Sequence, residues 1–150
     1  MARPDERGFG LLIVVVALAV LGGLALGAFA VGRREQRMAL DLVFAAQAFE
    51  AAEAGLAVAA VSAPAFVGVP VLVPQPGAVL ESGGVGYSTS VFRLNASLFL
   101  LTSEGRRLDG AGALLARREL GVLGRIVPTP DGAALRFQAL RTRPWVGVFR

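Results

Sequence analysis

The chain has 150 residues and a formal net charge of +4, and it contains no cysteine and no histidine. All 15 of its basic residues are arginine. These absences exclude disulfides, Ser-His, Cys-His and Ser-Lys catalytic pairs, Schiff-base and Walker lysines, and His/Cys zinc sites. The carboxylates are scattered without a calcium-loop spacing, so we expect a protein that is not an enzyme and that holds no metal ion or other cofactor.

The first predicted element is a membrane-spanning helix over residues 9–32, which follows a short polar segment, residues 1–8. No residue from 9 to 32 carries a charged side chain. As a helix this stretch would be ~36 Å long, more than the ~30 Å hydrocarbon core of a bilayer, and so small a chain could not cover it on all sides as a core helix. Gly23 and Gly27 have the four-residue spacing that lets membrane helices approach closely. Arginines flank both ends in similar number, so charge alone does not orient the helix.

The helical pattern continues through residues 33–62, where it becomes amphipathic. No proline interrupts the chain between Phe9 and Pro64, which predicts one continuous helix of about 54 residues, ~80 Å long. We expect its apolar stripe to pack on the chain's own globular domain, because an alanine-rich stripe of this length makes a poor coiled-coil zipper. The stripe consists of Met38, Leu42, Ala45, Phe49, Ala52, Leu56 and Ala59.

Residues 63–150 are predicted to form a β-sheet domain. We expect a long loop over residues 67–77, because its prolines cannot take part in a central strand. A glycine-rich turn at 83–86 is followed by β structure over 87–102 and by a wide connection over 103–112.

The remainder of this domain is expected to alternate between strands and turns. Residues 113–127 are compatible with a helix or a strand, although two glycines limit a helix there. A turn is predicted at 128–132, a half-exposed strand over 135–139, and an apolar, edge-like tail over 144–150.

Two runs in the first third of the chain resemble a known family. A short leader that ends in Arg7-Gly8, followed by an unbroken apolar helix from Phe9, resembles the class III N-terminus of type IV pilins and type II secretion pseudopilins. The later run Ala48-Phe49-Glu50-Ala51-Ala52-Glu53-Ala54-Gly55-Leu56 is similar to the alanine-rich signature of PilX-type minor pilins. Together the two runs lie within residues 7–57.

This resemblance implies an α+β fold in which a long N-terminal α-helix packs on a small antiparallel β-sheet, and it favours a strand over residues 113–127. It also implies that a prepilin peptidase cleaves the chain after Gly8 and that Phe9 becomes the N-methylated first residue. The fifth residue of the mature chain would be Ile13, where most pilins have a glutamate that pairs with the terminal amine of the next subunit. The absence of this glutamate implies a minor subunit at or near the tip rather than a major pilin.

The sheet domain contains two pairs of neighbouring arginines, Arg106 with Arg107 and Arg117 with Arg118. Arginines on one face can hold DNA phosphates, as the filaments of natural transformation do in the broad family that the chain resembles. The favoured interpretation is a solvated basic face, in keeping with the net positive charge of the chain.

Together these patterns predict a minor pilin or pseudopilin of a type IV pilus or a type II secretion pseudopilus. The expected partners are other pilins through the N-terminal helix, the prepilin peptidase, an inner-membrane assembly platform, and membrane lipid before assembly. We expect a single pass through the inner membrane, with the C-terminal domain outside the cytoplasm. Two alternatives stay open, a membrane-anchored domain with no filament role and a pilus-associated subunit for DNA uptake.

Overall fold

The computed structural model describes residues 6–140 and 145–147 of the chain. It divides into two units, Met1–Leu40 and Asp41–Arg150, and each is described by itself. One helix, α1 (Glu6–Ser62, 57 residues), contributes to both units, which confirms the predicted long helix. Pro64 lies at the start of the 3₁₀ helix η1 (Ala63–Phe66) that follows. Because proline has no N–H to donate to the preceding turn, α1 ends where the sequence predicted.

The first unit is a helical segment whose side chains are exposed. All thirteen large apolar side chains between Leu11 and Val31 are more than half exposed. An 18-residue window of α1 has a mean hydropathy of 2.8, so this helix is long and apolar enough to cross a membrane.

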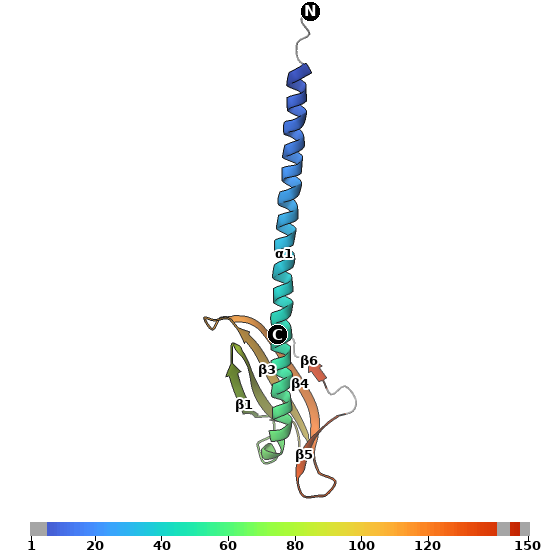
Figure 1. The fold of residues 1–150 in the computed structure, drawn as a ribbon. Coiled ribbons are helices and arrows are strands. Elements are labelled where there is room, and N and C mark those ends of the chain that lie inside the picture. The colour runs from blue at the N-terminus through green and yellow to red at the C-terminus, as the bar shows by residue number, and fades with distance from the viewer. Residues whose placement is uncertain (1–5, 141–144, 148–150) are drawn as a thin grey trace, which may run out of the picture. The chain divides into compact units, whose positions relative to one another are not determined.

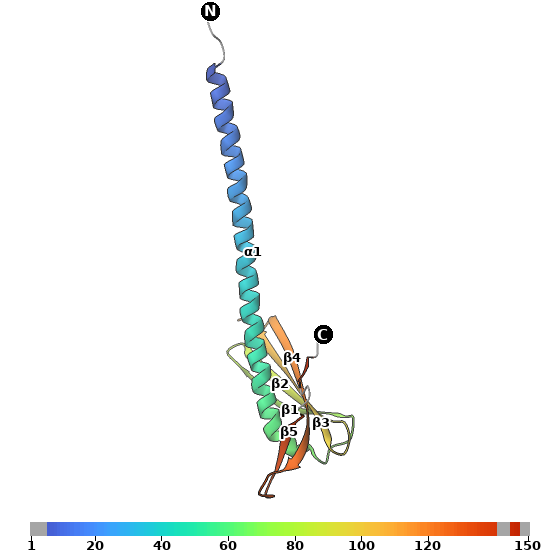
Figure 2. The same ribbon diagram turned by 90° about the vertical axis from the view of Figure 1, so that its right-hand side faces the viewer.

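The second unit is an antiparallel sheet with the C-terminal part of α1 on one face (Figures 1 and 2). Strands β1 to β5 follow one another across the sheet in chain order, and each pairs with its predecessor. The short β6 also pairs with β4, at Leu120–Val122, next to the segment Gly124–Pro128 that pairs with β5. The strands are β1 (Pro74–Ser82), β2 (Val85–Arg93), β3 (Leu98–Leu108), β4 (Leu114–Pro128), β5 (Leu135–Ala139) and β6 (Trp145–Gly147).

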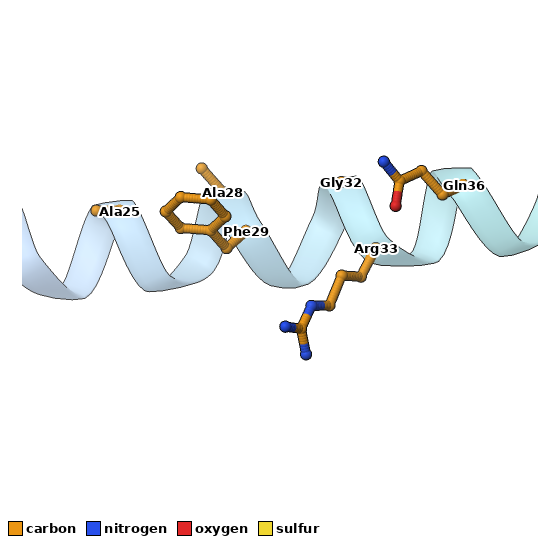
Figure 3. Close-up of a pocket in the computed structure, with 6 residues that line it drawn as sticks. All are labelled: Ala25, Ala28, Phe29, Gly32, Arg33 and Gln36. Atoms are coloured by element: carbon orange, nitrogen blue, oxygen red, sulfur yellow. The ribbon is translucent and has the colours of Figure 1, made fainter.

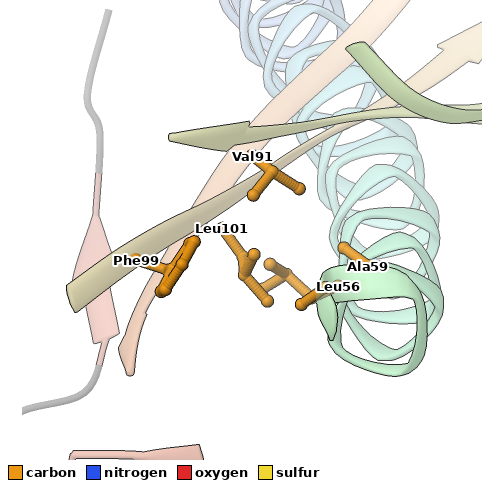
Figure 4. Packing of buried hydrophobic residues seen from close by; sticks show 6 residues of the cluster. Leu56, Ala59, Val91, Phe99 and Leu101 are labelled. Carbon is orange, nitrogen blue, oxygen red and sulfur yellow. The ribbon is translucent and has the colours of Figure 1, made fainter. Parts of the chain in front are cut away.

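The core of this unit lies between α1 and the central strands. Burial alternates along β3, where Phe99 and Leu101 are each 1 % exposed while their neighbours are only half-buried. Val91 of β2 and Leu56 and Ala59 of α1 complete the cluster (Figure 4). The period of two in burial shows that one face of the sheet is covered by the helix and the other is not.

The predicted apolar stripe of α1 is buried only in its C-terminal part. Its three C-terminal members are buried, but Met38, Leu42 and Phe49 are exposed, at 65 %, 71 % and 42 %. Near Gly105 the helix runs so close to β3 that only small side chains, those of Ala48 and Ala52, fit between them, whereas Leu56 further along α1 packs into the core. The small buried residues of α1 are Ala48, Ala51, Ala52, Gly55 and Ala59.

Two predicted loops are shorter than expected. The segment 67–77 was predicted as a loop, but β1 begins at Pro74, at the edge of the sheet, where the missing N–H of a proline is tolerated. The segment 103–112 was predicted as a wide connection, but β3 continues to Leu108. Glu104 and Arg106 are tolerated in the strand because they point to the uncovered face, and Arg107, on the other face, donates a hydrogen bond to the carbonyl oxygen of Gly83.

The remaining sheet predictions fare better. Residues 113–127 form a strand, β4, as the resemblance favoured, and a turn and the strand β5 follow where they were expected. Residues 87–102 are β structure, but they contribute to two strands, β2 and β3. The predicted turn at 83–86 is a tight hairpin, in which Gly83 and Gly84 both have positive φ, 60° and 74°, as a type I′ turn requires. Of the predicted tail, Trp145–Gly147 forms β6, and residues 144 and 148–150 lie outside the described residues.

Candidate assembly surface

The largest uncovered apolar surface of the described residues is the helix surface from Leu11 to Val31. Exposure of its large side chains ranges from 53 % at Ile13 to 73 % at Leu26. These side chains surround the helix on all sides, because the sequence has no polar residue in this stretch. A surface of this kind is stable in contact with lipid or with other apolar helices, and not in contact with water.

Gly23 and Gly27 lie one helical turn apart on this surface. A Cβ atom added at either position would meet nothing within 4 Å. The two glycines therefore form a flat strip against which another helix backbone can come close. The structure contains no second helix there, so their predicted role in helix packing stays a prediction.

Gly8 and Phe9, the predicted cleavage and methylation residues, lie in the first turns of α1. The structure describes their backbone only, and the first residue whose exposure it describes is Gly10. Processing between Gly8 and Phe9 is likewise a prediction that the structure leaves open.

The four arginines proposed as anion contacts are divided between the two faces of the sheet. Arg106 pairs across the strands with Arg117 on the uncovered face. Arg107 and Arg118 lie on the same face of the sheet as Gly105, which is the face toward α1. The separation has a simple cause, since neighbouring residues of a strand point to opposite faces.

The four arginines also differ in their interaction partners. On the uncovered face, Glu104 lies 3.7 Å from the Arg106 Nε and 3.6 Å from a guanidinium nitrogen of Arg117. On the helix side, Arg107 donates to the carbonyl oxygen of Gly83 at 2.9 Å, and Arg118 donates to the carbonyl oxygen of Arg117 at 3.0 Å. Arg107 therefore ties β3 to the turn between β1 and β2, and the four charges are not gathered on one basic face.

The junction between α1 and β3, at Gly105, is the tightest contact in the second unit, and it was not among the predicted sites. A Cβ on Gly105 would overlap the carbonyl oxygen of Ala48 and the nitrogen of Ala52. A Cβ on Gly55 would overlap the hydroxyl of Ser103 and the ring of Tyr87, whose nearest atoms would be 2.9 Å away. The signal was present in the sequence, because Ala48, Ala52 and Gly55 recur at helical spacing within the run that carries the PilX resemblance.

Ionisable groups offer little chemistry in the part of the chain that the structure describes. No group of three or more Asp, Glu, His or Cys residues among residues 6–140 and 145–147 is placed to hold a metal ion. In the turn between β4 and β5, the hydrogen bond from the Thr129 hydroxyl, helped by the amide of Ala133, holds the pKa of Asp131 below its usual value. Both hydrogen bonds to Asp131 come from within this exposed turn, so the lowered pKa is explained by the local structure of the turn.

Comparisons of the chain with known protein families, with curated proteins and with solved structures found no match.

Proposed function

We propose that the chain is a minor pilin or pseudopilin, a structural subunit that enters a type IV pilus or a type II secretion pseudopilus through its N-terminal helix. The observation that carries this proposal is the pilin-like layout, in which one helix bears a fully apolar stretch of surface and also packs on a small antiparallel sheet. The leader-like run before Phe9 and the alanine-rich run Ala48–Leu56 support it from the sequence.

The energetics of the apolar helix surface support an assembly role. Each of the thirteen large side chains from Leu11 to Val31 is more than half exposed, and covering one is worth roughly 1–2 kcal/mol. The total is on the order of 10–25 kcal/mol, of the same order as the ~5–15 kcal/mol that stabilises a typical domain. Lipid before assembly and neighbouring helices after it would cover the same surface, so the subunit would pass from membrane to filament with little net exposure.

Ile13 supports a minor subunit in particular. It is apolar and 53 % exposed, and no charged residue lies anywhere in the stretch 9–32. A carboxylate there would need a positively charged neighbour in the filament, because an unpaired charge in a bilayer core costs at least ~2.5 kcal/mol. A subunit without this carboxylate needs no such neighbour, which fits a place at or near the tip.

The test is the intact mass of the protein extracted from the membranes of its native host. A chain that begins at Phe9, with or without one added methyl group, is the expected result. Gly8→Val should leave the leader in place, because the peptidase of the resembled family requires the small residue before the cut. Gly10→Ala is the matched control, because a Cβ at this position meets nothing within 4 Å, and it should be processed normally.

The opposite result has a definite meaning. An unprocessed chain that begins at Met1 or Ala2 would overturn the pilin proposal and support the plain membrane-anchored domain. If the chain is processed, its presence in sheared filaments or in an isolated pseudopilus fraction then distinguishes the two machines.

A further inference from the structure

The hollow on the apolar stretch of α1 offers no specific contacts to a ligand. It is an open strip between Ala25 and Gln36 of a single helix, and the side chains of Arg33 and Gln36 extend to different sides of that helix (Figure 3). Lipid or a neighbouring helix covers such a strip equally well. The second unit, in contrast, contains a loop and a groove of complementary character.

The loop between η1 and β1, residues 67–73, carries three consecutive exposed apolar side chains. Val71, Leu72 and Val73 are 46 %, 69 % and 44 % exposed, and together they form an apolar knob. The sequence has no charged residue from Ala54 to Leu80, so no charged side chain of this stretch offsets the contact of the knob with water. Exposed apolar side chains that lie next to one another mark an interaction surface, whereas isolated ones do not.

Leu72, at the centre of the knob, also has a strained backbone. Its φ is 62°, and among residues 6–140 and 145–147 it is the one residue other than glycine with a positive φ. The Cβ of an L-residue makes this left-handed conformation unfavourable, and glycine or asparagine adopts it more readily. Because Leu72 is exposed, packing within its own chain does not explain the strain, which points instead to a contact outside the chain.

Arg93 of β2 holds the knob in place. The amide of Leu72 donates to the carbonyl oxygen of Arg93 at 2.8 Å, and Val71 forms a β-bridge with the same residue. The guanidinium of Arg93 donates in turn to the carbonyl oxygen of Val69 at 3.2 Å. A loop that is fixed in this way loses little further conformational entropy when its side chains enter a partner.

An apolar groove of about 360 Å³ lies between α1 and the strands β4 and β5 of the same unit. An apolar cavity of ~150 Å³ is large enough to hold benzene, so the groove has room for a leucine side chain and a neighbouring valine. The apolar lining comes from both the helix and the sheet, and it includes Leu56, Ala57, Ala60, Val122 and Phe137.

The charges beside the knob and the groove are opposite. Glu53 is exposed and is the charged residue of the groove lining. Both ion pairs found among the described side chains involve Glu104, so neither Glu53 nor Arg93 has an ion-pair partner in that part of the chain. A knob that enters the groove of another copy carries a cation toward an anion, and such complementarity favours the correct partner.

We propose that the apolar knob of one copy docks in the groove of a second copy of this chain. Leu72 enters between α1 and β5 of the second copy, and Arg93 lies on the side of the contact where Glu53 is found. Knob and groove are different surfaces, so the contact is heterologous and can repeat from one copy to the next. A lipid surface is a poorer partner, because Trp, Tyr, Lys and Arg anchor a chain at that surface and residues 54–80 contain none of them.

The knob is small compared with a stable interface. Three side chains cover far less than the ~800 Å² per partner that holds two proteins together in solution. We therefore expect the contact where the membrane anchor already brings copies side by side. The inference rests on the proposed function for this membrane insertion alone.

The test is disulfide crosslinking of the full chain in the membranes of its native host. The chain has no cysteine, so an introduced pair supplies its only thiols. One tagged copy carries Val73→Cys in the knob, a differently tagged copy carries Ala57→Cys in the groove, and mild oxidation should join them, because a disulfide requires Cα atoms within ~7 Å. Leu115→Cys in place of Val73→Cys is the matched control, since Leu115 is also apolar and 42 % exposed but lies outside the knob, and it should give much less product.

Second substitutions separate docking from chance proximity. Leu72→Asn keeps a residue that tolerates the left-handed conformation but removes the apolar side chain, so the crosslinked fraction should fall at least about fivefold. Ala60→Leu fills the groove and should also lower it, whereas Ala54→Leu adds the same bulk at an exposed position of α1 outside the groove and should not. Resistance to protease identifies the folded variants, and Leu72→Asn, which relieves strain at the surface, carries the test if Ala60→Leu does not fold. Unchanged crosslinking in folded Leu72→Asn would overturn the proposal.

Other results are also decisive. Equal yields from Val73→Cys and Leu115→Cys would indicate random collision in the membrane and overturn the docking contact. A Val73→Cys chain that crosslinks to a different protein, and not to a second copy, would overturn the choice of partner. Absence of the crosslink in a chain processed at Phe9 would overturn this contact and leave the proposed function intact, whereas the crosslink in a chain that keeps its leader would support the contact and overturn the pilin function.

Discussion

The contact between Gly105 of β3 and α1 gives the sharpest test of the fold. A Cβ at Gly105 would overlap backbone atoms of Ala48 and Ala52 and lie 3.0 Å from the Cβ of Ala52. Backbone atoms cannot rotate away as a long side chain can, so Gly105→Ala must lift the helix from the strand. Ala48 and Ala52 are both fully buried, and overpacking of a tight core costs about 1–3 kcal/mol. Because the lifted helix also loosens its neighbours, we expect a loss of about 2–3 kcal/mol.

The measurement is pulse proteolysis of the full chain in mild detergent over a range of urea concentrations. With an m value of about 1.5 kcal/mol per M, the urea midpoint of Gly105→Ala should fall by about 1.3–2 M. Gly110→Ala is the control, because a Cβ there meets nothing within 4 Å and its φ is not positive. Its midpoint should stay constant or rise slightly, since the unfolded chain loses entropy. Equal midpoints for the two variants would refute the close approach of α1 and β3.

Two further predictions concern charged groups of the second unit. Glu104→Gln removes the carboxylate that forms ion pairs with both Arg106 and Arg117. It should lower the free energy of unfolding by less than about 1 kcal/mol at low salt and by almost nothing at high salt, and a loss that persists in high salt would contradict the exposed ion pairs. Asp131 has a folded-state pKa below its usual 3.8 because of the Thr129 hydroxyl, so its stabilising effect is complete above pH 3.8 and disappears as the pH falls through the lowered pKa. A carboxyl NMR titration should show the pKa of Asp131 rise in Thr129→Val, and an unchanged titration would refute this cause.

The long helix could be predicted because its signals are local and strong. Residues 9–32 lack charge, no proline lies between Phe9 and Pro64, and nothing else in this stretch of the sequence competes with a helix. The C-terminal boundary at Ser62 followed directly from the missing N–H of Pro64.

The strand boundaries were harder because they depend on neighbours in the sheet. Pro74 and Pro76 indicate a loop in isolation, yet both lie in β1, where the edge position leaves their missing donors without consequence. The break between β2 and β3 contains neither glycine nor proline. There the side chain of Asn95 closes the turn by accepting hydrogen bonds from the amides of Ser97 and Leu98, both at 2.9 Å.

The candidate assembly surface was predictable only where its signal is local in the sequence. The uncovered apolar helix follows from composition alone, whereas the position of the arginines depends on strand phase. Arg106 and Arg107 are adjacent in the sequence and therefore on opposite faces once β3 extends through them. The helix half of the tight junction was visible in the spacing of Ala48, Ala52 and Gly55, but its partner Gly105 could not be identified without knowing which strand packs against α1, since glycine in a strand has many causes.

The strand order has a consequence for how an anchored chain acquires its fold. From β1 to β5 each strand pairs with the one that precedes it in the chain, and among the described strands only β6 returns past its predecessor. Connections of this kind close short loops and carry a small entropic penalty. Because each strand follows its sheet neighbour in the chain, the polypeptide can add one hairpin at a time to α1 in the order of its synthesis. The sheet can therefore form progressively, with most of its core in place before the last residues emerge.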